Sequence, residues 1–241
     1  MTNLLFQLPL DSASRSPHAP CLTFRDTTLD YATVARDIER FAAALIELGL
    51  PRQARVAVYL PKQPETVVTM FGAACAGCTF VPVNPVLKPA QVAYILRDCN
   101  VSVLVTSADR LRSLTADLME CPDLRHIVLV GADSGSAAPD RLAVHRWDSF
   151  DTATAKFHRV IDTDMVSIFY TSGSTGRPKG VVLSHLNMMT GAVSVSTYLQ
   201  NRAADRLLAV LPFSFDYGFS QLSTAFRVGA SITLMDYLLP R

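Results

Sequence analysis

Apolar positions near the start of the chain follow the spacing of an amphipathic helix. From Tyr31 to Leu48 they recur at alternating steps of three and four residues, the period of one helix face. Asp30 stands directly before this run as a candidate N-cap, and Gly49 directly after it as a stop signal. The pattern therefore predicts one helix between these two residues.

Beyond this helix, short continuous apolar runs alternate with amphipathic segments. The runs predict strands at 55–60, 79–83, 101–105, 127–130, 166–170, 207–211 and 231–235. The segments between them predict helices at 64–76, from Pro89, from a cap at Ser107 through Leu118, at 185–197 and at 217–226. Strands that are apolar throughout and alternate with helices are typical of an α/β fold, with mainly parallel sheets covered by helices.

The most apolar stretch, 66–87, raises the question of a membrane span. Because it contains Pro82, Asn84 and Pro85, it favours a buried helix followed by a strand, and no membrane span is expected. The chain has no basic residue before Arg15 and only a short apolar run there, so no secretory signal is visible. We expect a cytoplasmic protein.

Composition and charge exclude several classes of protein. With 49% hydrophobic and 18% charged residues, the 241-residue chain lies far from the disordered class and is long enough to bury a substantial core. Its 22 basic and 21 acidic residues leave a net charge of +1, without the positive footprint of a nucleic-acid-binding protein. Any anion site must therefore be local.

The five cysteines are an odd number in a chain too large to need disulfides, which indicates reduced thiols. Only Cys75 and Cys78 have a spacing that suits a metal or a redox pair. No histidine stands near them, and they end a predicted helix instead of opening one. We therefore interpret them as packing residues.

The segment from Thr171 to Gly180 carries the clearest chemical signal. Its ten residues include four hydroxyl side chains, three glycines and two cations. Glycines allow the backbone N–H groups to approach an anion, hydroxyls add donors, and Lys179 supplies a mobile positive charge. The composition predicts a phosphate-binding loop.

Two other interpretations of this segment are weaker. In a Walker A loop counted from Gly173, Pro178 would stand at the second glycine, and Gly180 would replace the Ser or Thr after Lys179. This spacing argues against a P-loop kinase or ATPase. A flexible surface loop would not require so many hydroxyls beside a lysine.

The run from Ile168 to Lys179 resembles the signature of the AMP-forming adenylating enzymes, the superfamily of acyl-CoA synthetases, amino-acid adenylation domains and firefly luciferase. Segments 29–31, 76–85 and 211–218 resemble further core motifs of that family, in the same order. The chain is most similar to the acyl-CoA ligases associated with exosortase A systems, through 213–218 and 236–241. The resemblance covers essentially the whole chain.

This resemblance implies ATP-dependent activation of a small carboxylic acid as an acyl-adenylate, followed by transfer to the thiol of coenzyme A or of an acyl carrier protein. The residues implied to hold the ATP β- and γ-phosphates are Thr171, Ser172, Gly173, Ser174, Thr175, Gly176 and Lys179. Thr171 and Lys179 are the implied catalytic residues. Mg²⁺ would be needed, but the loop has no carboxylate to bind it, so no metal ligand is assigned.

The resemblance also implies that Phe215, Asp216, Tyr217 and Gly218 belong to the substrate site. Phe215 would border the acyl and thiol channel. Asp216 resembles the aspartate that pairs with the substrate ammonium in amino-acid-activating members, although a loop or helix-capping aspartate is the simpler interpretation. His185 near the loop is assigned a structural role, because a carboxylate needs no deprotonation before attack.

Family members are considerably longer, so residues 1–241 are expected to be the N-terminal portion of an adenylation domain. The groups that fix the nucleoside and the small C-terminal domain would be missing, and the chain alone is expected to be inactive. Three hypotheses remain: a fragment of an acyl-CoA ligase, a fragment of an amino-acid adenylation domain that loads a carrier protein, and a noncatalytic remnant that binds phosphate or a partner.

Overall fold

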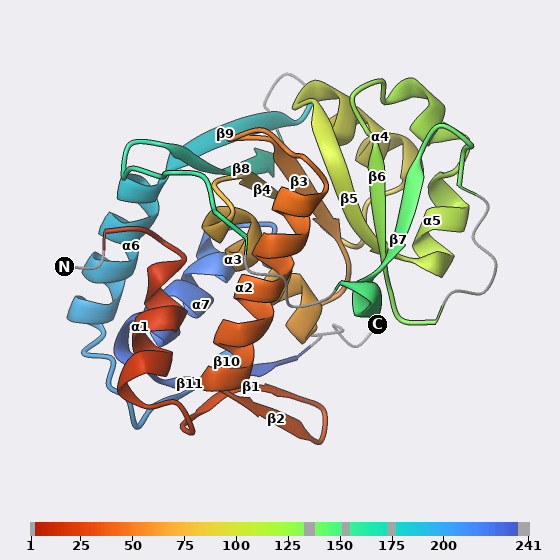
Figure 1. Ribbon diagram of the computed structural model, residues 1–241. Coiled ribbons are helices and arrows are strands. Elements are labelled where there is room, and N and C mark those ends of the chain that lie inside the picture. The colour runs from red at the N-terminus through yellow and green to blue at the C-terminus, as the bar shows by residue number, and fades with distance from the viewer. Residues whose placement is uncertain (1–2, 133–137, 151–154, 173–176, 236–241) are drawn as a thin grey trace.

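The computed structural model describes residues 3–132, 138–150, 155–172 and 177–235 (Figure 1). Its elements are, in chain order, α1 (Gln7–Arg15), β1 (Pro20–Phe24), β2 (Thr27–Asp30), α2 (Tyr31–Glu47), β3 (Arg55–Tyr59), α3 (Pro64–Cys75), β4 (Thr79–Pro82), α4 (Pro89–Asp98), β5 (Val101–Ser107), α5 (Ala108–Leu114), the 3₁₀ helix η1 (Asp117–Glu120), β6 (His126–Val130), β7 (Ala143–Arg146), the 3₁₀ helix η2 (Trp147–Ser149), β8 (Met165–Thr171), β9 (Lys179–Ser184), α6 (His185–Tyr198), β10 (Arg206–Ala209), α7 (Asp216–Val228) and β11 (Ser231–Leu234).

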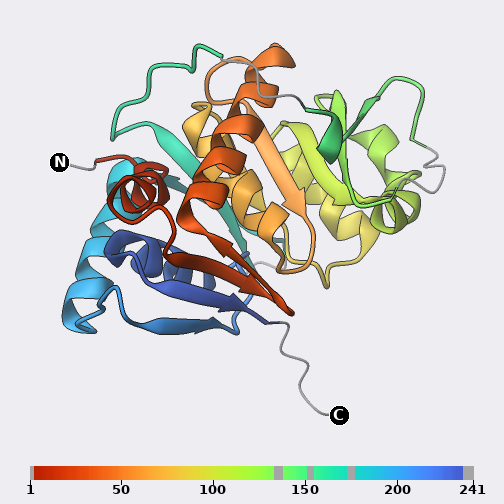
Figure 2. The ribbon, with the colours of Figure 1, turned by 60° about the horizontal axis from the view of Figure 1, so that its bottom comes forward.

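The described strands form two sheets. A seven-stranded sheet has the order β7-β6-β5-β3-β4-β8-β9, and only its β8–β9 pair is antiparallel. A four-stranded sheet has the order β10-β11-β1-β2, with β1 and β2 antiparallel. In Figure 2 the N-terminal strands, in red, lie beside the C-terminal strands, in blue. The predicted α/β class with mainly parallel sheets is confirmed.

Alternating side chains of the seven-stranded sheet enter two separate cores. Val56, Val58 and Phe80 face a large core between the two sheets, which also receives the buried faces of α2, α3 and α7. Ala57 and Tyr59 face the opposite side, where α4 and α5 cover the sheet. Helices therefore lie against both faces of this sheet, and its strands are apolar throughout for that reason.

The predicted helix α2 begins and ends where the sequence indicates. Asp30 is its N-cap, and the carboxylate accepts the N–H of Thr33 at 2.8 Å. Gly49 follows the helix with φ of +73°, a conformation that glycine adopts without strain. The apolar stretch 66–87 likewise forms a buried helix followed by a strand, as predicted. Among the described residues, no helix combines the length and the apolar character that crossing a membrane would require.

The helix predicted from Ser107 through Leu118 begins as expected, with Ser107 at its N-cap position, but its predicted end is wrong. The hydroxyl of Ser107 makes no capping hydrogen bond, and α5 already ends at Leu114. Thr115 bonds back to the carbonyl of Leu111 at 3.0 Å, and Leu118 lies in the separate helix η1. Leu111, Leu114 and Leu118 are nevertheless all buried, because the 3₁₀ turn keeps Leu118 on the same side as the other two.

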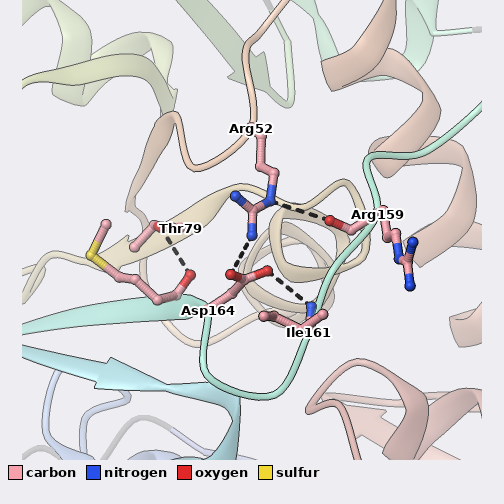
Figure 3. A network of polar contacts seen from close by, with 6 residues as sticks. Arg52, Thr79, Arg159, Ile161 and Asp164 are labelled. Carbon is pink, nitrogen blue, oxygen red and sulfur yellow. Dashed lines mark hydrogen bonds and ion pairs between the residues drawn. The ribbon is translucent and has the colours of Figure 1, made fainter.

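An ion pair joins distant segments at the amino ends of the central strands (Figure 3). Arg52, just before β3, contacts the carboxylate of Asp164, just before β8, and its Nε donates to the carbonyl of Arg159 at 3.2 Å. The second oxygen of Asp164 accepts the N–H of Ile161 at 2.9 Å. Burial alone would raise the pKa of Asp164, but these hydrogen bonds and the Arg52 charge lower it overall.

Candidate active site

The predicted phosphate loop connects the ends of two strands at one edge of the seven-stranded sheet. β8 runs parallel to β4, so its carboxyl end at Thr171 lies on the same edge as the carboxyl ends of the neighbouring parallel strands. β9 returns antiparallel from Lys179, and the Cα atoms of Thr171 and Lys179 are paired. In open α/β sheets this edge is where ligands bind.

The described residues of the loop present free donors to solvent. Thr171, Ser172 and Lys179 are exposed, and no hydrogen bond or ion pair to another described residue engages their side chains. The intervening Gly173, Ser174, Thr175 and Gly176 lie outside the described residues. The fold thus brings together two hydroxyls and an ammonium at the two ends of the loop, a combination suited to an oxyanion.

The loop that leads from β10 into α7 is the second predicted site segment. Lys62, between β3 and α3, is buried, and its ammonium donates to the carbonyls of Ala209 and Val210 at 3.0 and 2.7 Å. Sequence reasoning missed Lys62, because a lone lysine between apolar elements carries no local signal of its partners. Its hydrogen bonds fix the end of β10 against the carboxyl end of β3.

Gly218 has a structural role in this segment. A Cβ atom there would lie 2.0 Å from the carbonyl oxygen of Pro212, so only glycine allows the preceding loop to lie on the first turn of α7. Gly218 is buried and lines none of the cavities described below. It fixes the backbone of the predicted substrate segment.

An aromatic cluster connects the two predicted site segments. The ring of Phe219, in the first turn of α7, stacks on Phe80 at 5.2 Å and on Phe71 at 5.6 Å between ring centroids. It also meets Phe169 edge to face at 5.9 Å. Since Phe169 stands two residues before Thr171 on β8, the beginning of α7 is anchored next to the strand that leads into the phosphate loop.

Asp216 and Tyr217 line a cavity of about 460 Å³ between α6 and α7. Most of the other side chains around it are apolar or small, among them Met188, Ala192 and Val195 of α6. Asp216 is the first residue of α7 and not its N-cap, and its exposed carboxylate accepts the N–H of Tyr217 at 2.7 Å. The cavity is thus an apolar hollow with a carboxylate at its rim.

Phe215, which the resemblance places at the border of the acyl and thiol channel, does not line this cavity. It occupies the N-cap position of α7, makes no side-chain cap, and is 44% exposed. On the other side of the loop lies a cavity of about 430 Å³, lined by Lys62, Asn84, Arg110 and Ser214 among others. The hydroxyl of Ser214 is buried and has no partner among the described residues, which leaves it available to a ligand.

Comparison of the chain with known protein families gives a match that includes both predicted site segments. The family of AMP-binding enzymes matches residues 10–240. The chain belongs to this family. The match includes the phosphate loop and the segment before and within α7, so the AMP-binding resemblance predicted from the motifs is confirmed.

Known AMP-binding proteins similar to this chain include both ligases and peptide synthetases. The crotonobetaine/carnitine–CoA ligase of Salmonella heidelberg is 33% identical over 215 residues, which are 86% of this chain and 40% of the ligase. A linear gramicidin synthase polypeptide of Brevibacillus parabrevis is 27% identical over 222 residues, 92% of this chain and 3% of that polypeptide. The chain therefore spans less than half the length of either relative.

Among solved structures, the anthranilate CoA ligase AuaEII in complex with anthranoyl-AMP superposes with a TM-score of 0.88 at 25% identity, over 99% of this chain and 46% of that one. VinN in complex with 3-methylaspartate superposes with a TM-score of 0.79, also at 25% identity, over 96% of this chain and 61% of that one. These likenesses agree with the N-terminal portion of an AMP-forming adenylating enzyme.

His185 is a core residue. It is 1% exposed, and its Nδ1 accepts the N–H of Leu5 at 3.0 Å, which places the proton of the neutral ring on Nε2. Burial lowers its pKa to about 4. The ring joins α6 to the N-terminal segment, in agreement with the structural role assigned from the sequence.

All five cysteines are free and buried. Burial raises the pKa of Cys75 and of Cys78 to about 12, so both thiols stay protonated and unreactive. No group of three or more metal-binding side chains occurs among the described residues. The interpretation of the two cysteines as packing residues agrees with this environment.

Proposed function

We propose that this chain supplies the triphosphate-binding loop and part of the substrate pocket of an enzyme that activates a carboxylic acid with ATP and passes the acyl group to a thiol. The observation that carries the proposal is the pairing of Thr171 with Lys179 at the carboxyl edge of the sheet. The acyl-CoA ligases among its relatives support the same reaction class.

In the proposed reaction, a substrate carboxylate oxygen attacks the α-phosphorus of ATP. The bond from that phosphorus to the bridging oxygen of pyrophosphate breaks, and acyl-AMP forms. Two anions must approach each other, so donors already directed at the phosphates contribute most of the stabilisation that protein groups can give. Lys179 balances charge on the leaving pyrophosphate, while Thr171 and Ser172 donate hydrogen bonds. By sequence, Gly173 to Gly176 complete the phosphate contacts.

Mg²⁺, when bound, would share the negative charge of the triphosphate. The described loop residues offer hydroxyls and an ammonium but no carboxylate, so they fit the phosphates and not the metal. We assign no Mg²⁺ ligand in this chain. The metal would be held mainly by the phosphates and by groups outside residues 1–241.

We further propose that residues 1–241 form the N-terminal portion of an adenylation domain. The shares of 40% and 46% that the chain covers in two CoA ligases support this assignment. Groups that hold the adenine and ribose, and a small C-terminal domain, would then lie outside the chain. The chain alone would bind a triphosphate without completing the reaction.

The substrate pocket is the cavity between α6 and α7, and the cavity on the other side of the 210–215 loop offers the thiol donor a separate approach. The acceptor is coenzyme A or the thiol of a carrier protein. A second candidate function, activation of an amino acid for a carrier protein, is favoured by one observation. The carboxylate of Asp216 at the cavity rim would pair with a substrate ammonium.

Binding and exchange assays on purified chain test the proposal. Calorimetric titration should show Mg·ATP and tripolyphosphate binding that Lys179→Met weakens at least ~10-fold, through loss of a charge-assisted contact. Lys156→Met, which removes another exposed lysine, should leave binding unchanged. Carboxylate-dependent exchange of pyrophosphate with ATP should be absent. Exchange that Lys179→Met abolishes would contradict the inactivity of the isolated chain, and binding that does not depend on Lys179 would contradict the proposed loop.

A further inference from the structure

Helix α4 contacts the base of the phosphate loop through two tyrosine hydroxyls. The hydroxyl of Tyr94, on α4, donates to the carbonyl of Pro178 at 3.2 Å. The hydroxyl of Tyr170, on β8, donates to the Asp98 carboxylate of α4 at 2.6 Å. One helix therefore holds both arms of the β8–β9 hairpin.

The two bonded positions are adjacent to the residues that close the loop. Tyr170 directly precedes Thr171, and Pro178 directly precedes Lys179. In the antiparallel register Thr171 pairs with Lys179, and Tyr170 pairs with Gly180. The hydroxyl bonds thus act one residue away from the pair of Thr171 and Lys179, one on β8 and the other directly before β9.

Close packing supports the same arrangement. A Cβ atom on Gly180 would lie 2.7 Å from Cγ2 of Ile168 and 3.3 Å from Cζ of Tyr170. The ring of Tyr170 therefore lies across Gly180, and a side chain there would push β9 away from β8. Burial and the bond to Asp98 raise the pKa of Tyr170, so its hydroxyl keeps the proton that it donates.

The hydrogen bond from Tyr94 to the Pro178 carbonyl affects Lys179 through the peptide bond that joins the two residues. The ring of Pro178 fixes φ, and its carbonyl belongs to the peptide plane that carries the N–H of Lys179. A hydrogen bond to that carbonyl therefore fixes the orientation of the peptide unit from which Lys179 begins. Since the lysine side chain has four rotatable bonds, the direction of its Cα–Cβ bond decides which region the ammonium can reach.

We propose that Tyr94 is a positioning residue for Lys179, which directs the ammonium toward the phosphates through the hydrogen bond to the Pro178 carbonyl. The inference rests on the proposed function of the loop. The ring of Tyr94 packs partly against the core beneath α4. Tyr94 acts on the backbone at the start of β9.

A double-mutant cycle distinguishes this role from packing alone. Tripolyphosphate affinity is measured by calorimetry for the parent, Tyr94→Phe, Lys179→Met and the double variant, with a thermal midpoint for each. Tyr94→Phe keeps the ring and removes one hydrogen bond, so a ~3- to 10-fold weaker affinity is expected. In the Lys179→Met background the same change should have no further effect, because the residue through which Tyr94 acts is gone.

Tyr31→Phe is the matched control. Its hydroxyl, at the start of α2, also donates to a backbone carbonyl, that of Ala230 directly before β11, at 2.7 Å. It should lower the thermal midpoint and leave the affinity unchanged. Unaltered affinity in Tyr94→Phe, or an equal loss in the Lys179→Met background, would overturn the positioning role while the loop assignment stands. A folded parent that binds neither tripolyphosphate nor Mg·ATP would overturn the proposed function and this inference with it.

Discussion

Protonation of His185 should make the folded chain sensitive to mild acid. The imidazole is 1% exposed, and its Nδ1 already accepts the N–H of Leu5 at 3.0 Å. With a proton on Nδ1, the imidazole N–H would face the Leu5 N–H, so the hydrogen bond would be lost and a positive charge would lie in the core. Burial lowers the pKa of His185 to about 4, while the nearby Asp164 and Asp162 oppose that effect without reversing it.

The direction and size of the effect follow from linkage. Because the folded pKa is below the ordinary value of 6.5, the unfolded chain takes up the proton first as the pH falls. The stabilisation is fully present above pH 6.5 and is lost as the pH falls toward about 4. The whole interval corresponds to roughly 3 kcal/mol, and the part between pH 7.5 and pH 5.0 to about 2 kcal/mol.

Urea unfolding at pH 7.5 and pH 5.0 measures this loss. The parent should lose about 2 kcal/mol more than His185→Asn, whose side-chain oxygen can still accept the Leu5 N–H, and its midpoint should fall further by roughly 1 M. His126 and His145, whose pKa values burial also lowers, act equally in both proteins and cancel. His18→Asn, at an exposed imidazole, should behave like the parent. Equal pH dependence in the parent and His185→Asn would refute the reasoning.

Three further outcomes are expected. Gly218→Ala should lower the free energy of unfolding by roughly 2 kcal/mol or more in urea titrations, because its Cβ would meet a backbone carbonyl, whereas Gly191→Ala, in open space on α6, should not. Arg52→Met should cost about 1–2 kcal/mol at neutral pH, and the difference should shrink in pH titrations below 3.8 as Asp164 becomes protonated in both proteins. Lys62→Met should speed hydrogen exchange of the 209–215 amides and lower stability by about 1–3 kcal/mol, because two strand-end carbonyls lose their donor.

Helices and strands whose buried face is marked by regularly spaced apolar residues could be predicted from the sequence. Helix α2 is one example, since its cap, its apolar face and its terminating glycine are all local. The hairpin of β1 and β2 is not predicted, because its strands are short and half-exposed and its sheet is completed only far along the chain, as in the pairing of Leu22 with Ile232. No local pattern specifies such a partner, and the same holds for the contact between Lys62 and the end of β10.

In the candidate site, too, local features could be predicted from the sequence and features that depend on distant contacts could not. The composition of the loop indicated phosphate chemistry, and the antiparallel register brings Thr171 and Lys179 together as a hairpin must. The separation of Phe215 from the Asp216 cavity could not be foreseen, because it depends on where α7 begins. A shift of one residue at a helix start turns a side chain by about 100°, more than sequence boundaries resolve.

Both site segments share one structural principle, which explains why their conformation depends on distant residues. Tyr94 holds the β8–β9 hairpin through a hydrogen bond to one backbone carbonyl. Lys62 holds the loop before α7 through hydrogen bonds to two backbone carbonyls. Each donor comes from an element packed elsewhere in the core, so the scaffold and not the loop sequence sets the position of these backbones. Groups fixed in this way need little rearrangement when charge develops on a bound phosphate, which is the condition under which electrostatic stabilisation is most effective.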